Sequence, residues 1–132
     1  MSITLQQAES ALAAAKQKAL ETNTKMNIAV VDRGANLVAF ARMDGAWLGS
    51  LDIAQRKAKT AVYFDMDTMD LSPMVQPGKP LFQIEHSNGG LITFGGGVLI
   101  KDQAGEIIGA IGVSGSTVDA DHEVAEAGAK AL

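Results

Sequence analysis

Apolar and polar positions recur with two different periods along this chain, and those periods predict its helices and strands. In residues 4–22 the apolar positions return every three or four residues, which is the spacing of one helix face. Thr4 and Gln7 have the spacing of a capping box, so we expect this helix to begin at Thr4, and Asn23 is the expected stop. The apolar stripe expected to face the core consists of Leu5, Ala8, Leu12, Ala15 and Ala19.

Short apolar runs on either side of turn residues predict two β-hairpins. Residues 28–31 and 37–41 flank the sequence Asp-Arg-Gly-Ala-Asn, whose Asp, Gly and Asn favour a turn. Residues 98–100 and 107–113 flank a second polar turn in the same way. A further run, LITF at residues 91–94, predicts a fifth strand.

Two more helices complete the predicted order of elements. The first spans residues 50–64, with Ser50 as its cap and the apolar stripe Leu51, Ala54, Ala58 and Ala61. The second spans residues 118–131, with an inward face of Ala120, Val124, Ala127 and Ala131. Residues 65–80, which hold all three prolines, are expected to be irregular, and a short helix or turn is expected before Gly89. The order predicts one domain, residues 1–132, of mixed α/β (α+β) class with a largely antiparallel five-stranded sheet covered by helices.

Composition narrows the classes of function. The formal net charge of -4 and the pI of about 5.0 argue against a nucleic-acid-binding protein, which usually carries a basic face. No apolar run approaches the ~18 residues that a membrane helix needs, and the first residues lack a signal-peptide pattern, so a cytoplasmic location is expected. The absence of cysteine excludes disulfides and thiolate metal sites.

Gly109, Gly112 and Gly115 fall at every third position and raise the question of a phosphate-binding loop. Their spacing is not that of the dinucleotide fingerprint, the preceding element is a hairpin, and no Walker sequence occurs, so no nucleotide cofactor is expected. Gly109 and Gly112 admit two explanations: closely packed helices or a closely approaching ligand. Gly115 follows Ser114 in a strand-to-helix turn whose backbone N–H groups could hold an anion.

Several segments together resemble a known family. The pieces V-V-D-x-x-G, R-M-D-G-A, K-A-x-T-A, G-G-G and G-A-I-G-V-S-G occur in one order over nearly the whole chain. This combination resembles the GlcG/HbpS family of haem-binding and haem-degrading domains, which also forms the C-terminal domain of PduO-type proteins. The resemblance implies a profilin-like layered fold, assembly into homo-oligomers, and haem or a related tetrapyrrole as a ligand. The chain departs from the family at Leu99, where a proline often follows the glycines.

The expected ligand pocket lies where the segment VSGST meets the segment FGGGV. Arg42 is expected to hold a ligand carboxylate, because its planar guanidinium suits that group, and the alternative is a local ion pair with Asp44. Resemblance to the family adds Lys57 and Thr60 of the K-A-x-T-A piece, with Lys59 as a further cation. The expected ligand-binding residues are Arg42, Asp44, Lys57, Lys59, Thr60, Gly95, Gly96, Gly97, Ser114 and Gly115.

The chain contains two histidines, His86 and His122, which are the candidate axial ligands if haem binds. Asp119, His122 and Glu126 share one helix face, which favours a solvated stripe with a salt bridge from Glu126 to Lys130 over a partial metal site. No metal site is therefore expected. Ser114, Asp121 and His122 include the residue types of a catalytic triad, but their spacing does not establish one.

Three functions remain open from the sequence. The first is a tetrapyrrole-binding protein, although the aromatic content of 5% counts against a large flat ligand. The second is an accessory enzyme or binding protein for a small organic acid or diol in a glycolate, glycerol or propanediol operon. The third is a structural oligomer that scaffolds a partner enzyme. The sequence does not determine whether the protein catalyses a reaction.

Overall fold

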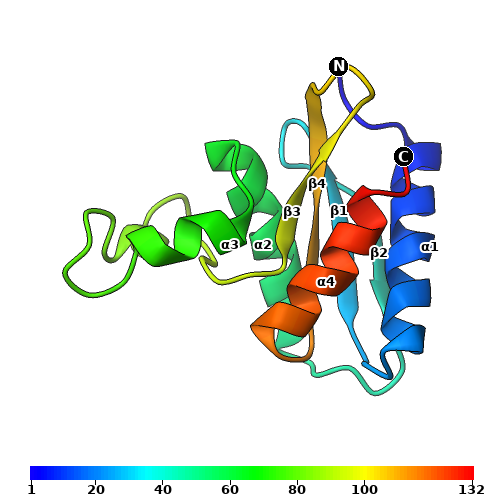
Figure 1. Ribbon diagram of the computed structural model, residues 1–132, viewed down its shortest axis with the longest axis horizontal. Coiled ribbons are helices and arrows are strands. Elements are labelled where there is room, and N and C mark those ends of the chain that lie inside the picture. The colour runs from blue at the N-terminus through cyan, green and yellow to red at the C-terminus, as the bar shows by residue number, and fades with distance from the viewer.

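The computed structural model describes residues 1–132 and shows an antiparallel sheet between two helical layers (Figure 1). Helices α1 and α4 pack side by side on one face of the sheet, and α2 lies on the other face. The mixed α+β class is therefore confirmed. In chain order the elements are α1 (Leu5–Glu21), β1 (Asn27–Asp32), β2 (Leu37–Arg42), α2 (Ser50–Phe64), α3 (Thr68–Leu71), the short 3₁₀ helices η1 (Ser72–Met74) and η2 (Ile84–His86), β3 (Gly97–Lys101), β4 (Ile107–Ser114) and α4 (Val118–Ala129).

The sheet has four strands in the order β2-β1-β4-β3, and all neighbours are antiparallel. Both predicted hairpins are confirmed, and both use the same turn. Asp32 Oδ1 accepts hydrogen bonds from the N–H groups of Gly34 and Asn36, and Asp102 Oδ1 accepts from the corresponding N–H groups two and four residues further on. An aspartate that satisfies two backbone donors fixes each turn from local sequence alone.

Small residues allow the layers to approach closely. Ala8, Ala11, Ala15 and Ala19 are the buried residues of α1, and its predicted capping box of Thr4 and Gln7 is present. On the opposite face, a side chain at Gly112 would overlap the backbone of α2 at Ala54 and Ala58. Close helix packing, which was one of two explanations left open by the sequence, thus accounts for Gly112.

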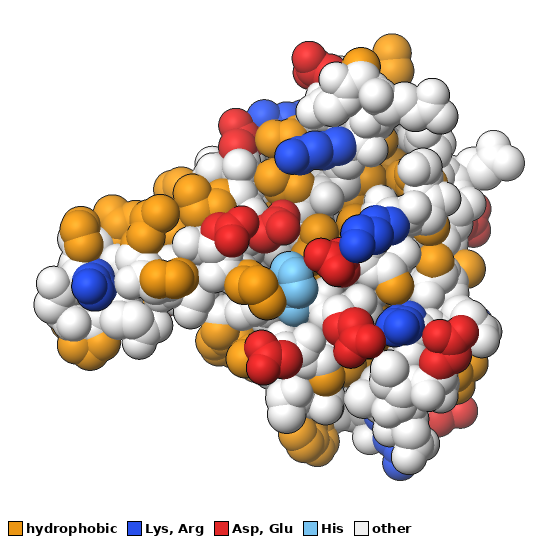
Figure 2. All heavy atoms as spheres, in the orientation of Figure 1, with side chains coloured by type: hydrophobic (Ala, Val, Ile, Leu, Met, Phe, Trp, Pro, Cys, Tyr) orange, Lys and Arg blue, Asp and Glu red, His pale blue; other side chains and the backbone are white.

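Residues 65–94 leave the body between α2 and β3 and form a projecting segment, here called the arm (Figure 1). The arm contains α3 and the two 3₁₀ helices, so residues 65–80 are less irregular than expected, while the short helix before Gly89 is confirmed. Figure 2 shows hydrophobic side chains gathered over the arm, and Met69, Met74 and Phe82 are exposed there.

The expected fifth strand at residues 91–94 is wrong. This segment pairs with no strand, because its backbone is held elsewhere: the N–H of Leu91 donates to Glu85 O and that of Ile92 donates to Thr60 Oγ1. The segment therefore fastens the returning arm to α2.

Three smaller expectations also fail. Ser50 is the first residue of α2 and does not cap it, since Gly49 holds the cap position without a side-chain hydrogen bond. Leu5 is 59% exposed, so the buried stripe of α1 begins at Ala8. Helix α4 ends at Ala129, and Ala131 is exposed. No helix has the length and apolar character needed to cross a membrane.

Candidate functional site

The two glycine-rich segments do meet, and the side chain of Lys57 fills the space between them. The N–H of Val113 donates to Gly96 O across the junction at 2.9 Å. Lys57 is fully buried, and its Nζ donates to Val113 O at 2.8 Å and to Asp121 Oδ2 at 2.9 Å. The ring of Phe94 lies over the same ammonium group, 4.9 Å from Nζ to the ring centroid. The lysine is thus satisfied by the protein itself.

Asp121 supplies the anion that the sequence analysis expected at the strand-to-helix turn. Its Oδ1 accepts the backbone N–H of Ser116 at 2.9 Å, and its Oδ2 pairs with Lys57. Burial lowers the pKa of Lys57, and the charge of Asp121 and its hydrogen bond oppose that shift. A buried pair of this kind joins α2, β4 and α4 at one point.

Two glycines of this junction, Gly96 and Gly97, are required by close packing. Gly96 has a φ of +126°, and a side chain there would overlap Val113 O and the side chain of Lys57. A side chain at Gly97 would overlap the backbone of Lys57. Gly96 and Gly97 therefore make room for the buried lysine, whereas Gly95 lines an open hollow of about 220 Å³ together with Met69, Phe94 and Val118.

Arg42 lies at a different place, on the wall of an open hollow of about 440 Å³. It is the last residue of β2, in register with Asn27 on β1, which in turn is in register with Ser114 on β4. Arg42 forms no ion pair with Asp44, although both line the hollow. The other charged residues of the lining are Lys16 and Lys25, so three cations and one carboxylate surround the space.

A second hollow of about 290 Å³ adjoins the first. The two share Asn23, Thr24 and Lys25 in their linings, and the second extends to Trp47 and Gly115. The indole of Trp47 is 65% exposed. The structure thus brings Arg42, Asp44 and Gly115 to one site around Lys25, which we call the Arg42 hollow.

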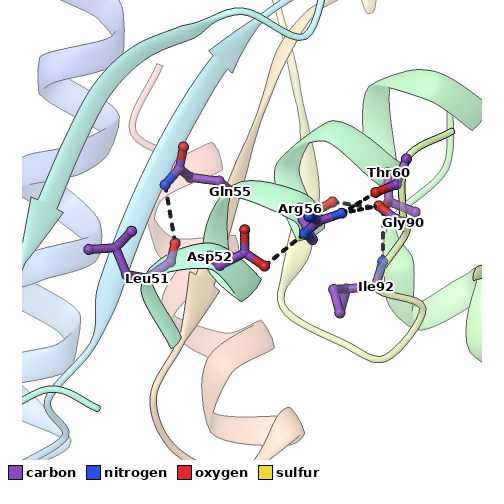
Figure 3. Close-up of polar contacts among 8 residues, drawn as sticks. Leu51, Asp52, Gln55, Arg56, Thr60, Gly90 and Ile92 are labelled. Carbon is purple, nitrogen blue, oxygen red and sulfur yellow. Dashed lines mark hydrogen bonds and ion pairs between the residues drawn. The ribbon is translucent and has the colours of Figure 1, made fainter. Parts of the chain in front are cut away.

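Thr60 lies elsewhere, where α2 faces the returning arm (Figure 3), and Lys59 lies on the same helix. Thr60 donates its hydroxyl to Arg56 O and accepts the N–H of Ile92. Arg56 donates to the carbonyls of Gly89 and Gly90 and pairs with Asp52 at 2.7 Å. These contacts hold the arm in place, and Lys59 lines a hollow of about 260 Å³ beside them.

Neither histidine lines the Arg42 hollow. His86 is exposed on the arm. His122 lies on α4 with a side chain only 13% exposed, so this position departs from the expected solvated stripe. Its Nδ1 is buried without a partner, and its Nε2 is 3.6 Å from Glu126. The expected salt bridge of Glu126 with Lys130 is confirmed at 3.2 Å, and this hydrogen bond lowers the pKa of Glu126.

Sequence reasoning missed four residues of these sites. Lys16, Lys25 and Trp47 line the Arg42 hollow, and Asp121 is the counter-ion of Lys57. An acidic residue in the first turn of a helix usually indicates interaction with the helix dipole, so Asp121 carried no separate signal for its partner 64 positions away. Lys25, between a helix and a strand, also reads as an ordinary solvated residue.

Fold and site together define the class: a layered α+β domain with two glycine-rich segments closed around a buried lysine–aspartate pair, and a cationic hollow at one end of its sheet. Residues 3–130 match the family described as haem degrading protein HbpS-like, and the chain belongs to that family.

Named relatives agree with this assignment. The chain is 40% identical over 124 residues to a 15.0 kDa protein encoded in the dhaT-dhaS intergenic region of Citrobacter freundii, covering 94% of this chain and 87% of that one. It is 35% identical to the corrinoid adenosyltransferase PduO of Citrobacter freundii, where the match covers 100% of this chain but 39% of PduO. Among solved structures, a complex described as PduOC:Heme is 32% identical, with a TM-score of 0.93 and coverage of 100% of this chain and 96% of that chain.

Proposed function

We propose that this protein binds haem or a related tetrapyrrole, with the ligand's carboxylates held in the Arg42 hollow. The observation that carries the proposal is the convergence of Lys16, Lys25 and Arg42 on one open space of about 440 Å³. Three cations facing one carboxylate leave the hollow with a positive balance, which favours an anionic group. The relative solved as PduOC:Heme supports the choice of ligand class.

The dimensions and the lining suit part of a tetrapyrrole. Ligand pockets usually measure roughly 300–1,000 Å³, and the two adjoining hollows are about 440 and 290 Å³. Exposed Trp47 offers an aromatic surface beside Lys25, and Leu20 and Met43 add apolar lining. Carboxylates would bind the cations while the flat ring lies against the indole.

A smaller carboxylic acid is the second candidate ligand. Polar side chains of Asn23 and Thr24 lie between the two hollows, and they offer hydrogen bonds that a hydroxy acid can use and a porphyrin ring cannot. In either case we propose binding, and the arrangement of residues assigns no catalytic group.

We also propose that the protein assembles into homo-oligomers, as its family membership suggests. Exposed apolar residues on the arm are consistent with burial against another chain.

A hemin titration tests the ligand proposal. A charge-assisted bond to a carboxylate contributes about 1.5–3 kcal/mol, so Arg42→Ala should weaken hemin binding by roughly ten- to a hundredfold while circular dichroism stays unchanged. Lys101→Ala removes the same charge from an exposed position outside both hollows and should leave the affinity at the wild-type value.

Each result of the titration has a defined meaning. If wild-type protein does not change the Soret band of hemin, the tetrapyrrole proposal is wrong. If it does and Arg42→Ala binds equally well, the ligand lies outside the Arg42 hollow. Displacement of hemin by millimolar glycolate would favour the smaller acid as the ligand of this site.

A further inference from the structure

The two edges of the sheet are treated differently by the rest of the chain. At the β3 edge, Asp67 Oδ1 accepts the N–H of Leu99 at 2.9 Å, and Thr68 Oγ1 accepts the N–H of Gly97 at 2.9 Å. Both acceptors belong to the base of the arm. The outward N–H groups of Gly97 and Leu99 are therefore already bonded, and the base of the arm covers the position that another strand would take.

The β2 edge has no such cover. The N–H of Asp32 donates to Asn36 O, and the N–H of Met43 donates to Met26 O. Every second residue of β1 therefore forms its backbone hydrogen bonds with β2. Because antiparallel pairing alternates, the N–H and C=O groups of Phe40 and Arg42 point away from β1. No side chain or loop of this chain hydrogen-bonds them.

The β2 strand also lacks most of the features that protect edge strands. Residues 37–41 carry no charge and no proline, and Leu37 is 48% exposed. The pairing register shifts once, so that Val38 forms a bulge, which leaves Ala39–Arg42 as the regular part of the edge.

We propose that two copies of this chain pair through β2, antiparallel and about a two-fold axis at Ala41, to give one continuous eight-stranded sheet. In this register Phe40 of each copy faces Arg42 of the other, and the two exchange backbone hydrogen bonds on both sides of the axis. The register uses only the regular part of the strand and avoids the bulge at Val38.

A second copy fits this edge better than an unrelated extended peptide. The pairing is self-complementary: the cation at Arg42 meets an aromatic ring, and no two like charges are opposed. Because the β3 edge is blocked by Asp67 and Thr68, pairing by edges stops at two chains and does not continue into a filament.

The pairing rests on the self-association proposed above and gives it a surface. It also adds to the ligand site, because Phe40 of the second copy would stand beside Arg42 at the rim of the Arg42 hollow. An aromatic residue from the partner would extend the apolar surface that Trp47 offers a flat ligand.

Two variants of opposite charge at one position test the register. Phe40→Lys places an ammonium group opposite Arg42 of the second copy and should halve the mass measured by light scattering. Phe40→Glu removes the same ring but places a carboxylate opposite Arg42, and it should retain the wild-type mass. The control Leu5→Lys adds charge at an exposed apolar residue of α1 and should also retain that mass.

Amide hydrogen exchange in the wild-type protein provides a measurement that needs no variant. The outward N–H groups of Phe40 and Arg42 should exchange slowly in the dimer, because they are then hydrogen-bonded to the second copy. In a chain with a bare edge they would exchange as fast as an unbonded amide.

The outcomes separate the surface from self-association itself. A wild-type mass near the monomer mass of 13.7 kDa overturns both the β2 pairing and self-association in general. A larger wild-type mass that is kept by both Phe40 variants, lost by both, or accompanied by fast exchange at Phe40 and Arg42 overturns the β2 pairing and leaves self-association standing through another surface.

Discussion

The side chain of Lys57 shows how one residue can explain a sequence motif. A fully buried lysine needs a counter-ion and hydrogen-bond acceptors, and Asp121 and Val113 provide them. Gly96 and Gly97 follow from this burial, since a side chain at Gly96 would overlap the lysine side chain and one at Gly97 its backbone. The glycine-rich segments suggest a ligand site in the sequence, but in the structure they surround the side chain of Lys57.

Lys57→Met should destabilise the fold by about 3–5 kcal/mol, because it leaves the Asp121 carboxylate buried without its counter-ion. Urea denaturation measures the change. The control Lys59→Met removes a half-buried lysine with no ion pair and should change stability by less than about 0.5 kcal/mol. Adding Asp121→Asn to Lys57→Met should recover part of the loss. Equal stability of the two single variants would contradict a structural role for the pair.

The pH dependence of the same comparison follows from the lowered pKa of Lys57. In the unfolded chain the pKa of a lysine is near its usual value of 10.5. At pH values between the lowered pKa of folded Lys57 and 10.5, the unfolded state therefore binds more protons than the folded state. The stability contribution of Lys57 therefore rises as the pH increases toward 10.5. The stability difference between wild type and Lys57→Met should widen from pH 7 into this alkaline range.

At the scale of elements, close approach of backbones determines where small residues occur. Helix α2 crosses β4 so closely that Gly112 touches its backbone at Ala54. On the other face the same closeness selects the buried alanines of α1. Packing between layers accounts for these positions without a ligand.

Gly112→Ala should destabilise the protein by about 1–3 kcal/mol, because its methyl group can be accommodated only if α2 moves away from the sheet. The matched control is Gly49→Ala, where a methyl group meets nothing within 4 Å and φ is negative, at -62°. Because the backbone of Gly49 is already helical, alanine fits there without strain and Gly49→Ala should not lower the stability. Thermal unfolding of both variants measures the difference. Similar melting temperatures would show that α2 moves away from the sheet at little cost in stability.

At the scale of the whole molecule, the candidate groups fall into separate regions. Arg42 and Lys25 lie at the hollow, His122 lies on α4, and His86 lies on the projecting arm. The buried pair of Lys57 and Asp121 lies at the glycine junction, and His122 lies beside Gly95 of that junction. No histidine lines the Arg42 hollow, so a ligand held there by Arg42 has no histidine within the same hollow to bind it.

The double variant His86→Ala, His122→Ala should consequently bind hemin with wild-type affinity, while Arg42→Ala binds more weakly. Soret titrations of the two proteins under the same conditions make the comparison. The reverse order, with affinity lost in the double variant and kept in Arg42→Ala, would move the site to the histidines and restore them as axial-ligand candidates.

Local interactions made much of this structure readable from the sequence. The capping box of Thr4, the aspartate-centred hairpin turns and the periodic stripe of α1 depend on residues close together in the chain, so they specify helices, hairpins and the mixed α+β class. The ordered motifs were sufficient to indicate the family.

Only the tertiary structure decided how distant segments share space. Residues 91–94 have the pattern of a strand, yet the arm returns them to Thr60 and not to the sheet. The pattern around Lys57 is typical of a surface cation, but the residue is buried because Asp121, distant in the sequence, lies in contact with its ammonium group. Arg42 and Lys25 meet at one hollow because β2 ends beside the chain that follows α1. Such partners are chosen by packing between layers, and no local pattern records which face of a neighbouring element a side chain will meet.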